Sequence, residues 1–318
     1  MRRSLLLRAL SIAASGALGL PGVGRAADLT KVRVNIIPLA DLAPFYAAMK
    51  QGYFKEEGLD IDTTPSTGGA VGIPGLVGGS FDIAYGNVVT TLLAASQGLD
   101  VVVISPAAGG YGRASGMVAR TADKIRSGAD LEGKTVAVNT RNNNIWLFAR
   151  AWVRKTGGNP DKVTFKEVPF PQMADALKNR QIDAAFHVDP FLTVLREQPD
   201  VYEVVGNPYN DVQPGVQIGQ YIATRAFVQK NPDVVRRFLA GLRKGNAWYD
   251  ARLSSPELAE LIAGYTRLSP EVTAKLKKGE TYKRIEVEEM RTTMQIMREQ
   301  GLLKKDVDVE ALVARLPN

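Results

Sequence analysis

Residues 31–63, KVRVNIIPLADLAPFYAAMKQGYFKEEGLDIDT, form the unit around which the rest of the chain can be arranged. Residues 31–37 are apolar and β-branched enough to predict a buried strand, and residues 45–51 predict a short helix that ends at Gly52. The polar turn between them contains Asp41, a candidate N-cap of the helix. Such a turn leaves free helix N–H groups at the carboxyl end of a strand, a geometry that suits a small anion.

The chain repeats this kind of unit weakly. Residues 32–35 resemble residues 136–139, and residues 76–85 resemble residues 177–186 at nearly the same separation. Because two separate matches have similar spacing, we predict two similar α/β lobes. Strands alternate with helices through both repeats, which predicts mainly parallel sheets whose ligand loops gather at the carboxyl ends of the strands. After residue 231 the pattern predicts only helices.

The composition argues against many enzyme classes. Because the chain has no cysteine, it has no disulfide framework or thiol nucleophile, and its single histidine argues against a conventional zinc site. The sequence contains no P-loop, nucleophile elbow or HExxH motif, and its Gly-Gly pairs do not form a dinucleotide fingerprint. We therefore predict a binding protein that is not an enzyme, with no catalytic residues, metal or cofactor.

The first residues have the pattern of a secretory signal peptide. Residues 1–26 begin with Arg2 and Arg3, continue through an apolar stretch and end in small residues that favour cleavage after Ala26. The paired arginines leave both the Sec and the twin-arginine (Tat) routes open. Loss of the four arginines in this segment lowers the formal net charge from +7 to +3, which does not indicate nucleic-acid binding. With no later membrane-spanning run and no cysteine for a lipid anchor, we expect a soluble periplasmic protein.

Polar residues of the first repeat are candidates for a binding site. Asp41, with Leu39, either shapes a ligand loop or only caps a helix. Tyr85-Gly86-Asn87 ends a strand and opens a helix, so that a ligand could approach the backbone at Gly86 and bond to Asn87. The alternative is a simple turn with a helix cap. Arg113 lies in a glycine-rich loop, where it either clamps a carboxylate or sulfonate or is a solvated surface residue.

The second repeat offers a polar loop at the start of its first helix. This loop comprises Thr140, Arg141, Asn142, Asn143 and Asn144. Helix-terminal N–H groups beside a guanidinium would favour a negative ligand, whereas the alternative is an asparagine-rich surface turn.

The end of a later strand carries the only histidine. His187 either bonds to the ligand, contacts the other lobe on closure or is structural, and Asp189 is at least a good helix cap before Pro190. The sequence offers neither a nucleophile motif nor a metal motif beside them, which argues against a catalytic role.

Several stretches together resemble the periplasmic solute-binding proteins of the nitrate/sulfonate/taurine ABC transporter family, related to the THI5/NMT1-like fold. They cover most of the chain after residue 26 and are, in order, residues 44–60 (PFYAAMKQGYFKEEGLD), 79–84 (GSFDIA), 130–137 (DLEGKTVA), 183–191 (DAAFHVDPF) and 224–232 (TRAFVQKNP).

This resemblance implies a type II periplasmic-binding-protein fold, with two mixed, mainly parallel sheets flanked by helices and joined by two hinge crossovers. The crossovers would fall near residues 116–120 and 218–224. The first lobe would then comprise residues 27–117 and 222–318, and the second lobe residues 118–221. Ligand would bind between the lobes, along loops near Asp41, Asn87, Thr140–Asn144 and His187–Asp189.

The resemblance also implies a function and partners. We expect a monomeric receptor that captures a small organic anion by lobe closure and hands it to an ABC permease. Arg141 and Arg113 are expected to hold the anionic group of an aliphatic sulfonate or an aliphatic or aromatic carboxylate. His187-Val188-Asp189 and the asparagine run depart from the family pattern, which leaves the identity of the solute open.

Two other functions fit parts of the pattern. A sensor module that presents ligand to a membrane receptor would have nearly the same sequence features. An enzyme or binder of the pyrimidine-related THI5-like branch fits less well, because that branch uses a cysteine-rich motif and several histidines, whereas this chain has no cysteine and carries an export signal.

Overall fold

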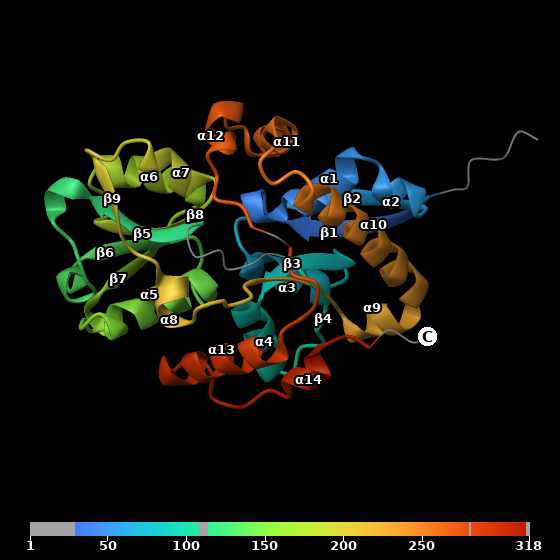
Figure 1. Cartoon of the computed structure of the whole chain (residues 1–318). Helices are drawn as coiled ribbons and strands as arrows, with labels where there is room; N and C mark the ends of the chain where they lie inside the picture. Colours follow the sequence, from blue (N-terminus) through green and yellow to red (C-terminus); the bar gives the residue numbers. More distant parts are fainter. Residues whose placement is uncertain (1–28, 108–113, 280, 316–318) are drawn as a thin grey trace, which may run out of the picture.

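The protein forms two α/β lobes that lie side by side (Figure 1). The computed structural model describes residues 29–107, 114–279 and 281–315. The predicted signal peptide, its cleavage site and Arg113 therefore lie outside the described residues. No helix within the described ranges combines the length and apolar character needed to cross a bilayer.

The first lobe is built on a mixed sheet whose strand order is β2-β1-β3-β10-β4. β1 pairs in parallel with β2 and β3, as the predicted strand–helix–strand unit requires, and β10 runs antiparallel between β3 and β4. The bounds are β1 Thr30–Ile36, β2 Leu59–Pro65, β3 Ile83–Asn87, β4 Val102–Pro106 and β10 Gly219–Ala223.

The second lobe repeats this arrangement in the order β7-β6-β8-β5-β9. β6 pairs in parallel with β7 and β8, and β5 is the antiparallel member. The bounds are β5 Ser115–Arg120, β6 Thr135–Val138, β7 Thr164–Glu167, β8 Ala184–Val188 and β9 Tyr202–Gly206. The two sheets confirm the predicted fold class of two mixed, mainly parallel sheets.

The chain crosses between the two sheets twice. The chain leaves the first sheet after β4 and enters the second as β5, and it returns after β9 as β10. All of β5 pairs within the second sheet and all of β10 pairs within the first. The predicted lobe boundaries at residues 117 and 221 fall inside these two strands, so the change of sheet occurs a few residues earlier in the chain than predicted.

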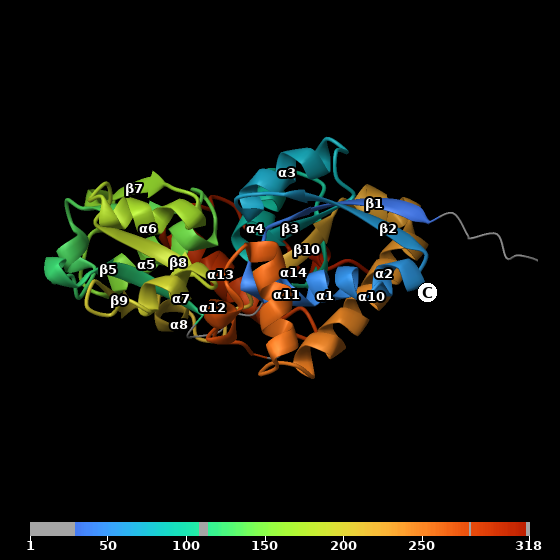
Figure 2. The same cartoon turned by 90° about the horizontal axis from the view of Figure 1, so that it is seen from above.

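Helices cover both faces of the first sheet. α1, α2 and α10 pack on one face, where Phe45, Phe54, Phe238 and Tyr221 form an aromatic cluster with ring centroids 5.2–6.4 Å apart. α3 and α4 lie on the opposite face (Figure 2). The bounds are η1 Ala40–Leu42 (a 3-10 turn), α1 Ala43–Lys50, α2 Tyr53–Glu56, α3 Gly69–Val77, α4 Val88–Ser96 and α10 Pro232–Asp250.

The remaining helices cover the second sheet and form the C-terminal part of the chain. Those of the second lobe are α5 Asn144–Lys155, α6 Phe170–Lys178, α7 Phe191–Arg196 and α8 Pro208–Val212. The C-terminal helices are α9 Arg225–Lys230, α11 Pro256–Thr266, α12 Pro270–Ala274, α13 Val287–Glu299 and α14 Val309–Leu312. All of these except α9 lie after residue 231, in the part of the chain that was predicted to be helical. Short 3-10 turns are η2 Thr121–Asp123, η3 Ala129–Leu131 and η4 Pro160–Lys162.

The C-terminal helices join the lobes. α13 contacts both α4 of the first lobe and α5 of the second. The Arg154 guanidinium donates to the Glu299 carbonyl oxygen at 3.0 Å, and Lys275, just after α12, forms an ion pair with Glu197 at the end of α7. These contacts hold the two lobes close together, so that the loops at the strand ends face one another.

Candidate ligand-binding site

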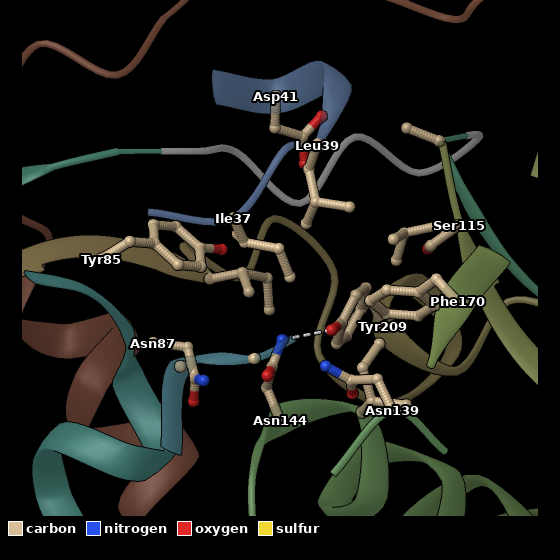
Figure 3. Close-up of a pocket in the computed structure, with 16 residues that line it drawn as sticks. Ile37, Leu39, Asp41, Tyr85, Asn87, Ser115, Asn139, Asn144, Phe170 and Tyr209 are labelled. Atoms are coloured by element: carbon tan, nitrogen blue, oxygen red, sulfur yellow. Dashed lines mark hydrogen bonds between the residues drawn. The ribbon is translucent and has the colours of Figure 1, made fainter. Parts of the chain in front are cut away.

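A cavity of about 30 Å³ lies between the lobes at the carboxyl ends of the parallel strands. This is room for two or three water molecules, since a single water molecule needs roughly 10–15 Å³ by the same measure. The first lobe contributes Ile37, Leu39, Asp41, Gly68, Gly69, Tyr85 and Asn87, and Ile218 precedes β10. The second lobe contributes Ser115, Asn139, Asn144, Ile145, Phe170, Val188 and Tyr209, with Ala114 just before β5 (Figure 3).

The starts of four helices from both lobes line this cavity, and three of them present glycine or asparagine to it. Gly69 opens α3, Asn87 is the N-cap of α4, and Asn144 is the first residue of α5. The Asn87 side chain accepts from the Thr90 N–H at 3.1 Å and so caps α4, which was the alternative to a ligand contact in the sequence analysis. Because the first-turn N–H groups of a helix have no intrahelical partner, the three helix starts make this wall electropositive.

Two tyrosine hydroxyls face the cavity. The hydroxyl of Tyr209 accepts a hydrogen bond from the Asn144 side-chain amide, which leaves its own proton free to be donated (Figure 3). The Tyr85 hydroxyl points into the cavity from β3 and makes no hydrogen bond to another described residue. Burial raises the pKa of both phenols above the usual value, so both remain neutral donors at physiological pH.

Asp41 supplies the carboxyl group of the cavity. It lies in η1, above the tyrosines, and forms no ion pair with any described residue (Figure 3). Burial, aided by the charge of Asp189, raises the pKa of Asp41 to about 8. The group is therefore mainly protonated at pH 7 and can donate a hydrogen bond. Of the two alternatives for Asp41, the helix cap does not apply, because Leu42 is the N-cap of α1 and no side chain caps that helix.

The rest of the lining is apolar. Phe170, the first residue of α6, stacks on Phe191 with ring centroids 6.1 Å apart, which fixes its ring at the cavity edge. Ile37, Leu39 and Ile145 contribute aliphatic surface. The cavity wall therefore combines hydrogen-bond donors with apolar surface, the kind of lining that small-ligand pockets commonly have.

The loop before α5 contains two kinds of residue: some line the cavity, and others hold the lining residues in place. Asn144 and its neighbour Asn139 line the cavity. Asn143 is the N-cap of α5, and its amide donates to the Asn139 side-chain oxygen at 2.9 Å and to the Thr140 hydroxyl at 2.7 Å. Asn139 in turn donates to the Thr67 carbonyl oxygen at 3.0 Å, which connects the two lobes. Asn143 and Thr140 thus position the cavity wall without lining it.

Arg141 does not occupy the position we predicted for it. Its side chain is exposed and donates to the Phe165 carbonyl oxygen at 2.6 Å, and its backbone N–H bonds to Glu167, so the residue is held against β7. Asn142 is also exposed, at a turn with φ of 54° that faces the loop away from the cavity. The alternative interpretation, a surface turn, describes these two residues.

His187 and Asp189 are buried beside the cavity and do not line it. Side chains alternate along β8, so Val188 faces the cavity and His187 packs beneath the sheet. His187 is fully buried, and neither ring nitrogen has a hydrogen-bond partner among the described residues. Asp189 accepts from the Thr193 N–H at 3.0 Å and from its hydroxyl at 2.8 Å, as a helix cap does.

Gly86 also lies beside the cavity and does not line it. It packs against β10, and a Cβ atom at this position would come within 2.9 Å of the Ile222 side chain. Packing between neighbouring strands, and not approach of a ligand, accounts for this glycine.

Several lining residues were missed by the sequence analysis. Tyr209 belongs to α8, a five-residue helix with no periodic signal. Phe170 and Ser115 begin elements whose ends are poorly marked in the sequence. Asn139 could have been found, because it directly follows β6, at the carboxyl end of a strand where ligand loops gather.

The two lobes and their strand order, with a small cavity where helix starts of both lobes meet, define a type II periplasmic-binding-protein fold. The sequence profile described as "NMT1/THI5 like" matches residues 40–257, and the chain belongs to that family. A Brucella abortus protein named only as a binding protein is 28% identical over 212 residues, which cover 66% of this chain and 63% of that relative. The bicarbonate-binding protein CmpA of Synechococcus elongatus is 23% identical, over 77% of this chain and 60% of that protein.

The solved structures agree with this fold. The alkanesulfonate-binding protein SsuA of Xanthomonas axonopodis, bound to MOPS, superimposes with a TM-score of 0.77 at 17% identity and covers 91% of this chain and 99% of that one. This likeness supports the fold of two lobes around a cleft.

Proposed function

We propose that this chain is the exported receptor of an ABC importer, and that it captures a small organic anion by closure of its two lobes. The solute classes we propose are aliphatic sulfonates and aliphatic or aromatic carboxylates, for which the lobes would open beyond the present cavity of about 30 Å³. The observation that carries the proposal is the convergence of three helix starts from both lobes on one small cavity. A negative group there would be stabilised by N–H groups of both lobes at once, which favours the closed arrangement.

The donors for the anion differ from those expected from the sequence. No arginine or lysine lines the cavity among the described residues, so helix N–H groups, the Tyr85 and Tyr209 hydroxyls and protonated Asp41 take the place of Arg141. Arg113 lies outside the described residues and stays a prediction. These neutral donors suit one charged group better than two, and the apolar lining suits a short aliphatic or aromatic body.

Relatives are named for anions, which supports the same proposal. The names of CmpA and SsuA refer to bicarbonate and to alkanesulfonates. Partnership with a permease and the periplasmic location follow from this transport role. A sensor that presents ligand to a membrane receptor is the alternative, and it shares the same cleft.

The test is a thermal-shift screen of the protein without residues 1–26. The probes are alkyl sulfonates, aliphatic and aromatic carboxylates, nitrate, bicarbonate, pyrimidines and, as charge-reversed controls, primary amines. A compound that binds only the folded state raises the melting temperature. We expect the largest shifts from monoanions. A shift with amines and none with anions would overturn the proposed charge of the solute, because Asp41 would then act as a carboxylate partner for a cation.

The Tyr85→Phe variant tests the hydroxyl at the centre of the proposed site. Removing a donor from a charged acceptor costs about 1.5–3 kcal/mol, so we expect the affinity for the best anion to fall by about 10- to 150-fold. The Arg141→Ala variant is the matched control and should bind that anion as tightly as the unmodified protein does. Isothermal titration calorimetry measures both variants, and equal effects of the two substitutions would contradict this assignment of donors.

A further inference from the structure

A second cavity lies on the first lobe, away from the cleft, and its volume of about 500 Å³ is far larger. β4 forms one wall, α10 a second and the segment between α12 and α13 a third. Its lining residues are Ile104, Ser105, Pro106, Leu239, Leu242, Arg243, Asn246, Ala247, Tyr282, Lys283, Arg284 and Ile285. Cavities of roughly 300–1,000 Å³ commonly hold small ligands in proteins.

The interior of this second cavity is apolar and its rim is cationic. Leu239, Leu242 and Ile285 give it aliphatic surface, while Arg243, Lys283 and Arg284 are exposed at its edge. Lys283 is paired with Asp250, and the Arg284 Nε atom lies 2.7 Å from a Glu286 carboxylate oxygen. Arg243 forms no ion pair with a described residue, so its charge at this rim is not compensated by any acidic group in the described ranges.

The third wall is held in place by the chain that links the lobes. Gln217, in the crossover before β10, donates to the Arg284 carbonyl oxygen at 2.9 Å and accepts from the Glu286 N–H at 3.1 Å. Tyr282 donates to the Gly215 carbonyl oxygen at 3.2 Å. Since these bonds fix the wall from behind, the cavity is a formed feature of the fold.

We propose that this cavity is a second ligand site, which takes an amphipathic monoanion, a carboxylate on an aliphatic chain. The chain would lie against Leu239, Leu242 and Ile285, and the carboxylate would pair with the Arg243 guanidinium. This site shares no lining residue with the cleft. The inference therefore does not depend on which solute the cleft takes.

Octanoate is the probe, and isothermal titration calorimetry on the protein without residues 1–26 is the measurement. We expect octanoate to bind at the second cavity and butanoate to bind there at least about tenfold more weakly, because each buried methylene contributes roughly 0.8 kcal/mol. The Arg243→Glu variant should weaken octanoate binding by about tenfold or more. Arg243 is exposed, so this variant should fold, and its melting temperature verifies that. Octylammonium, of the same chain length and opposite charge, should bind Arg243→Glu better than it binds the unmodified protein.

Two controls separate this site from the cleft. Arg236→Glu makes the same charge change two turns earlier on α10, outside the cavity lining, and should leave octanoate binding unchanged. Tyr85→Phe alters the cleft and should also leave it unchanged. Octanoate binding that persists in Arg243→Glu, or that is lost in Tyr85→Phe, overturns the second site. Either result would leave the thermal-shift evidence for solute binding in the cleft as it stands.

Discussion

At the scale of the residue, the buried His187 makes the free energy of unfolding depend on pH. Its ring is fully buried, and burial lowers the pKa of His187 to about 3. The unfolded chain binds a proton at this histidine below its ordinary pKa of about 6.5, whereas the folded protein does not. The contribution of His187 to the free energy of unfolding is therefore complete above pH 6.5 and falls as the pH decreases toward 3.

The prediction is that a His187→Leu variant lacks this acid sensitivity. Between pH 7 and pH 5 the unmodified protein should lose about 2 kcal/mol more of its free energy of unfolding than the variant does. Urea denaturation at several pH values measures the difference. Parallel pH profiles for the two proteins would show that the folded state protonates His187 as readily as the unfolded chain does.

Asp41 has the opposite effect on stability, because its contribution decreases as the pH rises. Burial raises the pKa of Asp41 to about 8, so the folded protein retains a proton that the unfolded chain releases above about pH 4. The contribution of Asp41 is therefore present at low pH and is lost as the pH rises through 8.

An Asp41→Asn variant keeps the size of the side chain and removes its titration. We expect the free energy of unfolding of this variant to vary less between pH 6 and pH 9 than that of the unmodified protein. The same variant should still bind the anion, since a neutral amide can donate as the protonated carboxyl does. Loss of anion binding in Asp41→Asn, with stability unchanged, would instead show that the carboxylate itself contacts the solute.

At the scale of the element, α1 and α10 pack closely because glycine lies at their contact. A Cβ atom at Gly245 would lie 2.3 Å from the Pro44 carbonyl oxygen and 2.9 Å from the Ala48 side chain. The Pro44 carbonyl oxygen belongs to the backbone and cannot move aside as a flexible side chain can. Even a methyl group at position 245 would therefore push the two helices apart.

The Gly245→Ala variant should therefore be destabilised by about 1–3 kcal/mol, although alanine is the better helix former. Gly264 in α11 is the matched control, because a Cβ atom there would have no neighbour within 4 Å. Gly264→Ala should increase stability by roughly 0.5–1 kcal/mol. Thermal denaturation compares the two variants, and a shift of the same sign in both would contradict the close packing of α1 on α10.

At the scale of the whole molecule, two kinds of contact connect the lobes. The Asn139 amide donates to the Thr67 carbonyl oxygen beside the cavity, and Asn139 is buried. The Lys275–Glu197 ion pair lies on the outer surface, with about half of each side chain exposed. Because water screens exposed ion pairs, the hydrogen bond at the cavity should contribute more to closure.

An Asn139→Ala variant should therefore shift the ligand-free protein toward the open arrangement by roughly 0.5–1.5 kcal/mol, about a two- to tenfold change in the closed-to-open ratio. Lys275→Ala should change this ratio less. Small-angle X-ray scattering detects the larger radius of gyration of the open protein. A larger radius in Lys275→Ala than in Asn139→Ala would show that the surface ion pair contributes more to closure than the buried hydrogen bond does.

The repeated strand–helix units and the helical C-terminal tail were predictable because each depends on local periodicity. The candidate site was predictable only in part. Asn87 and Asn144 could be placed because they begin helices that follow strands, whereas Arg141 could not, since its direction depends on Glu167 and the Phe165 carbonyl oxygen in another strand.

The amino-acid sequence by itself determined the class of fold and the two-lobed organisation, because apolar periodicity and turn residues act over short distances along the chain. The tertiary structure decided which polar groups face the cavity. A shift of one residue along a strand reverses the side-chain direction, so Val188 lines the cavity and His187 is buried behind it. Tyr209 and Asp41 meet there because the chain crosses between the lobes twice, a contact that no local pattern encodes.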